Sequence, residues 1–331
     1  MTFGKKTGLG LGVALVAIVS LIAQATGVIP GSISRNPIRI TMHLWPGYAH
    51  SYIAQEKGFF RDEGVDVELN LIEGVDSNLK HFREGKADLA FGLQSDAMLL
   101  AAQGVPLNIV SVADYSNGGD VIISRLDIKD VAGLKGMRVS VDKLNGFNHI
   151  FLVELLRLNG LEESDVIVVP LPASAVPDAL DNGTIDAGQT WEPYQSQAMA
   201  KGHRLLATTR DAPGVVTDVL MVKSDVLEKR TEDIQKILKC LFRALRFRAT
   251  HEAEAYAIMS RAYGVPAGSL KRTVEGNTFP DLAGNILAFE DSGALFRSGR
   301  TISDFFLKKG IVQKPIDLSK IHAPGIVRSL N

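Results

Sequence analysis

Two stretches decide the fold: Glu84-Gly85-Lys86-Ala87-Asp88-Leu89-Ala90 and, 98 residues further along the chain, Asn182-Gly183-Thr184-Ile185-Asp186-Ala187-Gly188. A glycine and an aspartate fall at the same places in both, and each stretch is followed by a matching glycine, Gly104 and Gly202. A repeat of this length is too long for a solenoid unit. It predicts two similar lobes, each with the same turn into a strand, and a cleft between the lobes.

Alternating strands and helices surround both stretches. The predicted strands are 38–44, 65–71 and 88–92 around the first stretch, 137–141, 166–171 and 185–190 around the second, and a return strand at 219–222. Helical spacing separates them, and this order predicts an α/β fold with largely parallel sheets and right-handed crossovers. We expect one lobe to comprise 37–122 together with 218–331, and the other to comprise 123–217.

The chain becomes helical after residue 230. Thr231 begins a long amphipathic helix with Glu232 and Asp233 in its first turn, a favourable arrangement at a helix N-terminus. Further helices are predicted at 251–263, 288–298 and 301–309. We expect these helices to pack on the first lobe and to form no second cleft.

The N-terminus has the pattern of an export signal. Lys5 and Lys6 precede an apolar run, 9–25, that ends in Ala23-Gln24-Ala25. This pattern is typical of a secretory signal peptide, so 1–25 is predicted to direct the chain to the periplasm or another extracytoplasmic compartment. An uncleaved anchor reaching about residue 36 stays open, because 7–34 carries no charge and is long enough to span a bilayer. Membrane contact is expected only through this segment.

The composition is that of a globular protein. Of 331 residues, 46% are hydrophobic and 22% charged, and the net charge of −1 gives no reason to expect binding to nucleic acid. The single cysteine, Cys240, excludes an internal disulfide and a cysteine-based metal site. We expect a monomer without a metal or a cofactor.

The candidate binding residues follow the strands. In open α/β sheets, ligands bind beyond the carboxyl ends of the strands, where helix N-termini present free backbone N–H groups. In the first lobe these positions are Trp45, Gly47, Tyr48, Gln94, Ser95, Asp96, Asp114, Ser116 and Asp120. In the second lobe they are Asn145, Gly146, Phe147, Trp191 and Glu192, and at the return crossing they are Thr217 and Asp218.

Both tryptophans of the chain, Trp45 and Trp191, belong to this set. A tryptophan directly after a strand can simply cover the core. Two of them at strand ends on opposite lobes favour a cleft lining in which the rings hold an apolar or cationic group.

Acidic residues dominate the predicted cleft. Asp96, Asp114, Asp120 and Asp218 are either turn formers and helix caps or partners for a ligand. With Glu192 they outnumber the basic residues nearby, so a purely anionic ligand would depend on backbone N–H groups. A ligand with an ammonium group would find carboxylates.

Catalysis has no sequence support. The chain has no G-x-S-x-G motif, no phosphate-binding loop, no nucleophilic cysteine motif and no zinc-ligand spacing. We expect a protein that is not an enzyme.

Several motifs stand in a fixed order along 37–320: Trp45-Pro46-Gly47-Tyr48, Lys57-Gly58-Phe59-Phe60, Gly85 with Asp88, Ser95-Asp96-Ala97, Val112-Ala113-Asp114-Tyr115-Ser116 and Trp191-Glu192-Pro193. Their order and spacing resemble the nitrate/sulfonate/taurine class of ABC-transporter solute-binding proteins. The resemblance implies a type II periplasmic-binding-protein fold, in which two mixed-sheet α/β lobes, joined by two crossing strands, close around a small molecule. It also implies delivery of that molecule to the permease subunits of an ABC importer.

The resemblance makes taurine or another aliphatic sulfonate the nominal ligand. A sulfonate suits helix N-termini, and an amine suits Asp96 or Asp114. The acid-rich turns argue against a simple inorganic anion. Two alternatives stay open: a membrane-anchored extracytoplasmic sensor, and a protein of the related branch that binds or makes the thiamine pyrimidine precursor. The members of that branch that make the precursor carry a cysteine-rich motif, which this chain lacks.

Overall fold

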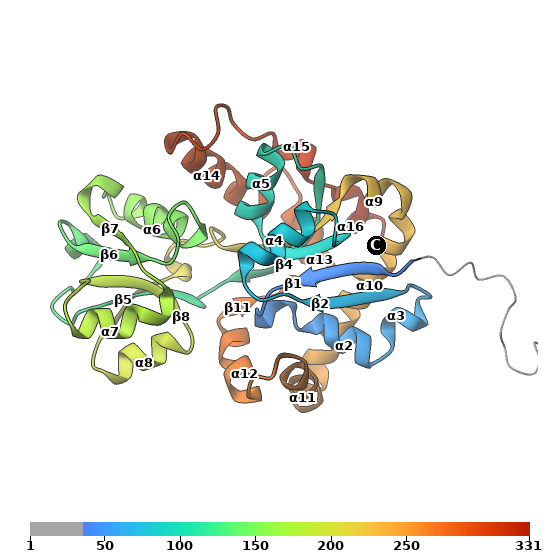
Figure 1. Ribbon diagram of the computed structural model, residues 1–331, viewed down its shortest axis with the longest axis horizontal. Coiled ribbons are helices and arrows are strands. Elements are labelled where there is room, and N and C mark those ends of the chain that lie inside the picture. The colour runs from blue at the N-terminus through green and yellow to red at the C-terminus, as the bar shows by residue number, and fades with distance from the viewer. Residues whose placement is uncertain (1–35) are drawn as a thin grey trace, which may run out of the picture. The chain divides into compact units, whose positions relative to one another are not determined.

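The computed structural model describes residues 36–331, so the predicted signal peptide, residues 1–25, lies outside the described residues. Within Pro37–Asn331 the chain forms two sheets, each with helices on both faces (Figure 1). The expected α/β fold with two mixed-sheet lobes is confirmed. None of the helices in the described part of the chain is both long and apolar enough to cross a membrane.

The first sheet has six strands in the order β11-β4-β10-β3-β1-β2. They are β1 (Ile38–Met42), β2 (Val67–Leu71), β3 (Leu89–Leu93), β4 (Leu107–Ser116), β10 (Thr217–Lys223) and β11 (Asn277–Thr278). The strand β1 is parallel to β2 and β3, whereas β10 is antiparallel to β3 and β4. All five residues of β3 are buried, as expected for a central strand covered on both faces.

The second sheet repeats this arrangement with five strands in the order β7-β6-β8-β5-β9. They are β5 (Asp120–Ser124), β6 (Arg138–Val141), β7 (Ile167–Pro170), β8 (Ala187–Trp191) and β9 (Arg204–Thr208). The strand β6 is parallel to β7 and β8, and β5 is antiparallel to β8 and β9.

The helices divide between the lobes as the chain does. With the first sheet lie α2 (His50–Glu56), α3 (Phe59–Asp62), α4 (Val75–Arg83), α5 (Gln94–Ala102), α9 (Ser224–Lys229), α10 (Thr231–Thr250), α11 (Glu252–Tyr263), α12 (Ala267–Glu275), α13 (Leu282–Ala288), α14 (Ala294–Lys308), α15 (Leu318–Ile321), α16 (Pro324–Arg328) and the 3-10 turn Pro46–Tyr48. With the second lie α6 (Phe147–Leu158), α7 (Val176–Asp181), α8 (Tyr194–Ala200) and the 3-10 turns Val131–Leu134, Glu163–Asp165, Ala173–Ala175 and Thr209–Asp211.

The repeated glycines occupy equivalent turns. Gly85 and Gly183 have φ angles of 74° and 71°, and Gly104 and Gly202 have φ angles of 85° and 92°. Side chains with a Cβ rarely adopt this left-handed conformation. The repeat therefore arises because both lobes contain the same two turns. One turn leads into the central strand, which is β3 in the first lobe and β8 in the second, and the other turn ends the helix that follows this strand.

Two chain crossings join the lobes and are bonded to each other. The first leads from β4 into β5, and the second leads from β9 into β10. Thr209 Oγ1 lies 2.9 Å from Ser116 Oγ and accepts a hydrogen bond from the backbone N–H of Gly118 at 2.8 Å. Arg210 donates from Nε to the carbonyl oxygen of Asn117 at 3.0 Å. These bonds tie the crossings into one short connection.

The lobe and helix limits differ in detail from those predicted. The strand β5 pairs in the second sheet from Asp120 onward, a few residues before the predicted limit at 122/123. The helices predicted at 288–298 and 301–309 are one helix, α14. In the sequence, Gly299 suggests a break between two helices. In the structure it lies inside α14, where a Cβ added at this position would meet the Leu318 side chain at 2.8 Å. The glycine therefore allows close packing.

Candidate functional site

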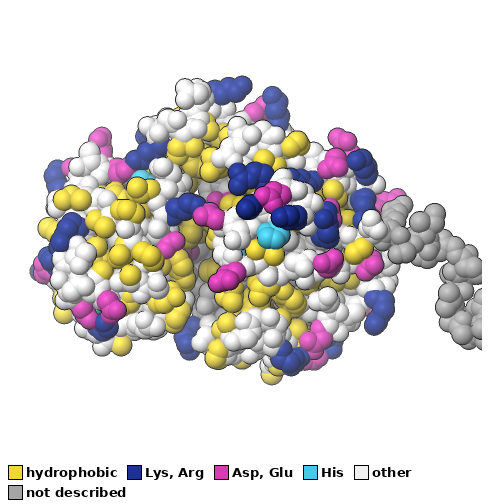
Figure 2. Space-filling model, viewed as in Figure 1, with side chains coloured by type: hydrophobic (Ala, Val, Ile, Leu, Met, Phe, Trp, Pro, Cys, Tyr) yellow, Lys and Arg dark blue, Asp and Glu magenta, His cyan; other side chains and the backbone are white. Residues whose placement is uncertain are grey.

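A cavity of about 330 Å³ is lined by residues of both lobes. The first lobe supplies His43, Leu44, Trp45, Gly74, Val75, Leu93 and Asp218, the second supplies Asp120, Asp142, Phe147 and Trp191, and Val216 belongs to the crossing from β9 into β10. Figure 2 shows hydrophobic side chains along the crevice between the lobes. The cavity is large enough for a small organic molecule.

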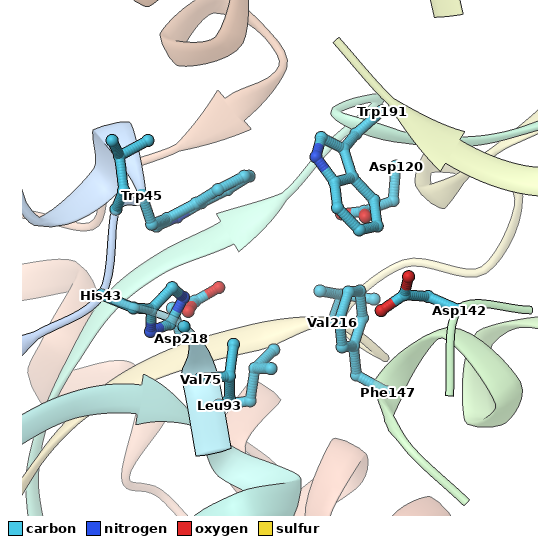
Figure 3. Close-up of a pocket in the computed structure, with 12 residues that line it drawn as sticks. His43, Trp45, Val75, Leu93, Asp120, Asp142, Phe147, Trp191, Val216 and Asp218 are labelled. Carbon is cyan, nitrogen blue, oxygen red and sulfur yellow. The ribbon is translucent and has the colours of Figure 1, made fainter. Parts of the chain in front are cut away.

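The lining residues stand at strand ends, as the strand-end rule predicts. Trp45 lies just beyond β1, Trp191 is the last residue of β8, and Phe147 begins α6 after β6. The rings of Phe147 and Trp191 lie 6.3 Å apart between centroids. In Figure 3 the indole of Trp45 extends from one lobe toward that of Trp191 on the other. The two tryptophans thus form opposing walls of one cavity.

Trp45 is held by a carboxylate behind it. Its Nε1 donates to Asp114, 3.2 Å from Oδ2, and Asp114 is itself fully buried. Gly47 leaves the room for this contact, because a Cβ at that position would lie 2.0 Å from Asp114 Oδ2 and 2.5 Å from Trp45 Nε1. Asp114 and Gly47 therefore set the position of the indole.

Tyr48 anchors a second carboxylate. Its side chain is fully buried and stacks on Phe91 at 4.8 Å between ring centroids, and its hydroxyl donates to Asp218. Asp218 lines the cavity. Burial, with Asp114 next in effect, raises the pKa of Asp218 well above its usual value.

Asp120 forms the corresponding carboxylate of the second lobe. Its backbone N–H donates to Ser116 Oγ at 3.1 Å, and its Oδ1 accepts from Gln189 Nε2 at 3.1 Å. Burial raises the pKa of Asp120 to about 6, against the lowering effect of Ser116 and Gln189. Burial likewise raises the pKa of Asp114 to about 7.

A second cavity, of about 290 Å³, adjoins the first and shares Gly74, Val75, Leu93, Asp142 and Phe147 with it. It lies between the N-terminal turns of α4 and α6, and its other lining residues are Asp76, Ser77, Asp96, Lys143, Gly146 and Asn148. Burial raises the pKa of Asp96 to about 7.

One ion pair closes the cleft at this end. Lys143 Nζ of the second lobe lies 2.6 Å from Asp76 Oδ1 of the first, and both side chains are exposed. We call this pair the cleft bridge.

The remaining predicted residues lie around the cavity or away from it. Glu192 lines a further cavity together with the two tryptophans. Ser116 and Thr217 bond within the crossings, Thr217 through Oγ1 to the carbonyl oxygen of Gly214 at 2.8 Å. Asn145, with a φ angle of 63°, accommodates the tight turn before α6, and its N–H donates to His149 Nδ1 at 3.1 Å.

Gln94 and Ser95 are buried at the start of α5, and neither is among the lining residues. Gln94 donates from Nε2 to the carbonyl oxygen of Leu295 at 2.7 Å, so it holds α14 against the first lobe. No hydrogen-bond partner of Ser95 Oγ is present in the described part of the chain.

Sequence reasoning missed three polar or flexible positions of the cavity: His43, Gly74 and Asp142. The strand-end rule could have found Asp142, because it directly follows β6, and Gly74, because it lies shortly after β2. His43 follows β1 in the same way. Within 36–331 no group of three or more His, Cys, Asp or Glu side chains could hold a metal ion.

Comparison with known proteins identifies the family. A family model described as "NMT1/THI5 like" matches residues 45–255. The "Putative aliphatic sulfonates-binding protein" of Bacillus subtilis is 24% identical over 93% of both chains. The taurine-binding periplasmic protein of Escherichia coli is 23% identical, over 73% of this chain and 78% of that one.

Two further relatives differ from these in the extent of the match or in the kind of protein named. The match to the "Putative binding protein YtlA" of Bacillus subtilis, 24% identical, covers 62% of this chain and 64% of that protein. Some relatives are named as enzymes, among them the 4-amino-5-hydroxymethyl-2-methylpyrimidine phosphate synthase of Aspergillus parasiticus, 26% identical over 68% of this chain and 70% of that one.

The fold has a counterpart among solved structures. The periplasmic aliphatic sulphonate binding protein SsuA of Escherichia coli superposes with a TM-score of 0.73 at 21% identity, over 87% of this chain and 92% of that one. The expected periplasmic-binding-protein fold is thereby confirmed, and so is the expected relation to the sulfonate and taurine class. The chain belongs to the NMT1/THI5 like family.

Proposed function

We propose that this chain is the exported solute-binding component of an ABC importer and that it captures a small polar organic solute between its lobes. The observation that carries this proposal is the cavity whose walls come from both lobes, with Trp45 on one side and Trp191 on the other. A ligand that contacts both walls binds the closed arrangement more tightly than the open one. That difference in affinity is what drives closure.

Taurine or another aliphatic sulfonate is the nominal solute. The names of two relatives support it. So does the second cavity, where the N-terminal turns of α4 and α6 face the space and Lys143 supplies a positive charge. Taurine also carries an ammonium, which matches the carboxylates Asp120 and Asp218 of the first cavity.

We propose no catalytic step for this chain. Capture and release need only the two walls and the connection between the lobes, and delivery is the task of the permease subunits. The alternative of a pyrimidine-precursor synthase would require a reactive group in the cleft. Cys240, the single cysteine, is buried in α10 and is not a lining residue of the cavity.

Binding is tested by calorimetry and by the intrinsic fluorescence of the two tryptophans, both of which line the cavity. We expect taurine to bind with a dissociation constant in the micromolar range, to change the fluorescence and to raise the melting temperature. Binding weaker than millimolar for taurine and for simple alkanesulfonates would contradict the nominal solute.

Export and delivery need separate experiments. N-terminal sequencing of the exported protein should show a new end near residue 25, whereas an intact Met1 or Thr2 would favour the anchored sensor. Deletion of the chain, or of the permease that it serves, should abolish uptake of the labelled solute. Unchanged uptake in the deletion strain would contradict the importer role.

A further inference from the structure

The ionisable lining of the cavity between the lobes is acidic. Its lining residues include the carboxylates of Asp120, Asp142 and Asp218, and none of the described residues that line it is a lysine or an arginine. His43 also lines it, and burial lowers the pKa of this imidazole to about 4, so it is neutral at physiological pH. A purely anionic ligand would be repelled here.

The two innermost carboxylates have no cationic partner within 36–331. Elsewhere in the chain, Asp88 and Asp186 each bind an arginine side chain. In the cleft, Asp120 accepts from a neutral amide and Asp218 from a neutral phenol, although both are at most 4% exposed. A buried carboxylate that has lost water and gained no counter-ion interacts strongly with any cation that reaches it.

The walls of the cavity suit a cation as well. The indoles of Trp45 and Trp191 and the ring of Phe147 line it. The faces of aromatic rings, those of tryptophan above all, attract ammonium and guanidinium groups. Figure 3 shows these rings on the same cavity as the carboxylates of Asp120 and Asp218.

One unused hydrogen-bond acceptor lies at the same place. His43 Nδ1 is buried at the cavity and has no partner among the described residues. In the neutral tautomer that carries its proton on Nε2, this nitrogen can accept from a ligand N–H. No group of three metal-ligating side chains occurs within 36–331, and the aromatic walls suit an organic cation.

We propose that the cleft recognises its solute by a positively charged nitrogen, which sits between Trp45 and Trp191 against Asp120 and Asp218. This inference rests on the proposed function and narrows the ligand to small organic cations and zwitterions. Any sulfonate or other acidic group of the solute is then secondary to the ammonium or guanidinium group.

Two matched pairs of probes test the charge directly. Choline is compared with 3,3-dimethylbutan-1-ol, which has the same shape without the charge, and taurine is compared with ethanesulfonate, which lacks the ammonium. Calorimetry on the purified protein at pH 7.5 should show each charged-nitrogen probe binding at least about tenfold more tightly than its partner. Equal affinity within both pairs, or failure of choline and taurine to bind, would overturn the inference.

Variants locate the effect in the cleft. Asp218→Asn keeps an acceptor for Tyr48 but removes the charge, and Asp120→Asn likewise keeps an acceptor for Gln189. Each should weaken taurine binding about tenfold while leaving ethanesulfonate unchanged. Asp225→Asn, at an exposed residue of α9 that follows the opposite end of β10 from Asp218, is the control and should change neither. Equal losses for taurine and ethanesulfonate would overturn the inference.

The outcome separates this inference from the proposed function. If ethanesulfonate binds as tightly as taurine, the chain still captures a solute and only the role of the charged nitrogen fails. If uptake of the bound compound does not depend on the permease, the importer role fails, whereas the preference for a cation stands on the binding data alone.

Discussion

Asp88 and Asp186, one in each lobe, make the same contacts. Asp88 accepts from the backbone N–H and the Nε of Arg39 at 2.9 and 3.0 Å, and Asp186 accepts from the same two groups of Arg138 at 2.9 and 3.0 Å. The backbone N–H of each aspartate in turn donates to the carbonyl oxygen of its arginine at 2.9 Å. The aspartate is therefore repeated because it fastens the central strand of each sheet to its neighbour.

Removal of one of these charges should destabilise its lobe. Asp186 is buried and also binds Arg125, at 2.6 Å, so Asp186→Asn leaves Arg138 without a charged partner and Arg125 with Asp127 alone. We expect a loss of about 2 to 3 kcal/mol in the free energy of unfolding, measured by urea denaturation. Asp127→Asn is the control, because Asp127 binds Arg125 from an exposed position and its substitution should change the free energy of unfolding far less. Equal effects of the two substitutions would contradict this account.

Gly47→Ala should impair binding more than folding. The new methyl group would lie 2.0 Å from Asp114 Oδ2, so the Trp45 indole or Asp114 must move. We expect the affinity for the solute to fall at least about tenfold, because the ring then loses its contact with the ligand. Gly268→Ala serves as the control, since no atom lies within 4 Å of a Cβ at that glycine. A solute affinity unaffected by Gly47→Ala would show that the position of Trp45 is unimportant.

The side chains on the two walls of the cleft were easier to predict from the sequence than the contacts between segments far apart in the chain. Trp45 and Trp191 could be placed because each directly follows a strand end, a local pattern. The same strand-end rule selects Gln94, yet its side chain bonds to the backbone of Leu295, 201 residues away. No local signal shows that α14 packs onto α5 of the first lobe and also contacts α6 of the second, where the rings of Phe305 and His149 lie 5.2 Å apart between centroids. Asp142, in contrast, was within reach of the strand-end rule and was overlooked.

The stability of the ligand-free protein should fall as the cleft carboxylates ionise. Burial raises the pKa of Asp120 to about 6, so the folded protein binds more protons than the unfolded chain between about pH 4 and 6, and stability decreases with rising pH in that window. Asp120→Asn removes this effect. The other titratable or charged groups in this cluster of buried carboxyl groups are Asp96, Asp114, Asp218, Tyr48 and Arg248.

The measurement is the difference in melting temperature between Asp120→Asn and the wild-type protein, in the absence of ligand. This difference should increase from pH 4 to pH 8 by an amount equivalent to about 3 kcal/mol at most. Asp225→Asn, at an exposed position, should give a difference that changes little with pH. A difference for Asp120→Asn that shrinks as the pH rises would show that a lysine or arginine balances the carboxylate.

The cleft bridge between Lys143 and Asp76 should slow the release of the solute. Because both side chains are exposed, the pair is worth little and is screened by salt. We expect Lys143→Gln to raise the release rate several-fold in low salt and to have almost no effect in 0.5 M salt, as measured by stopped-flow fluorescence. Lys201→Gln, which breaks pairs within the second lobe only, is the control and should not change the rate.

Lys143 also lines the second cavity, so an effect of Lys143→Gln on the release rate could instead come from the loss of a direct contact between Lys143 and the solute. A double-variant cycle separates the two causes. If the bridge acts, Asp76→Asn should speed release as much as Lys143→Gln does, and the double variant should be no faster than either, because one broken pair cannot be broken twice. If Lys143 instead binds the solute directly, Asp76→Asn should leave release unchanged or slow it, since it removes a competing partner of the lysine.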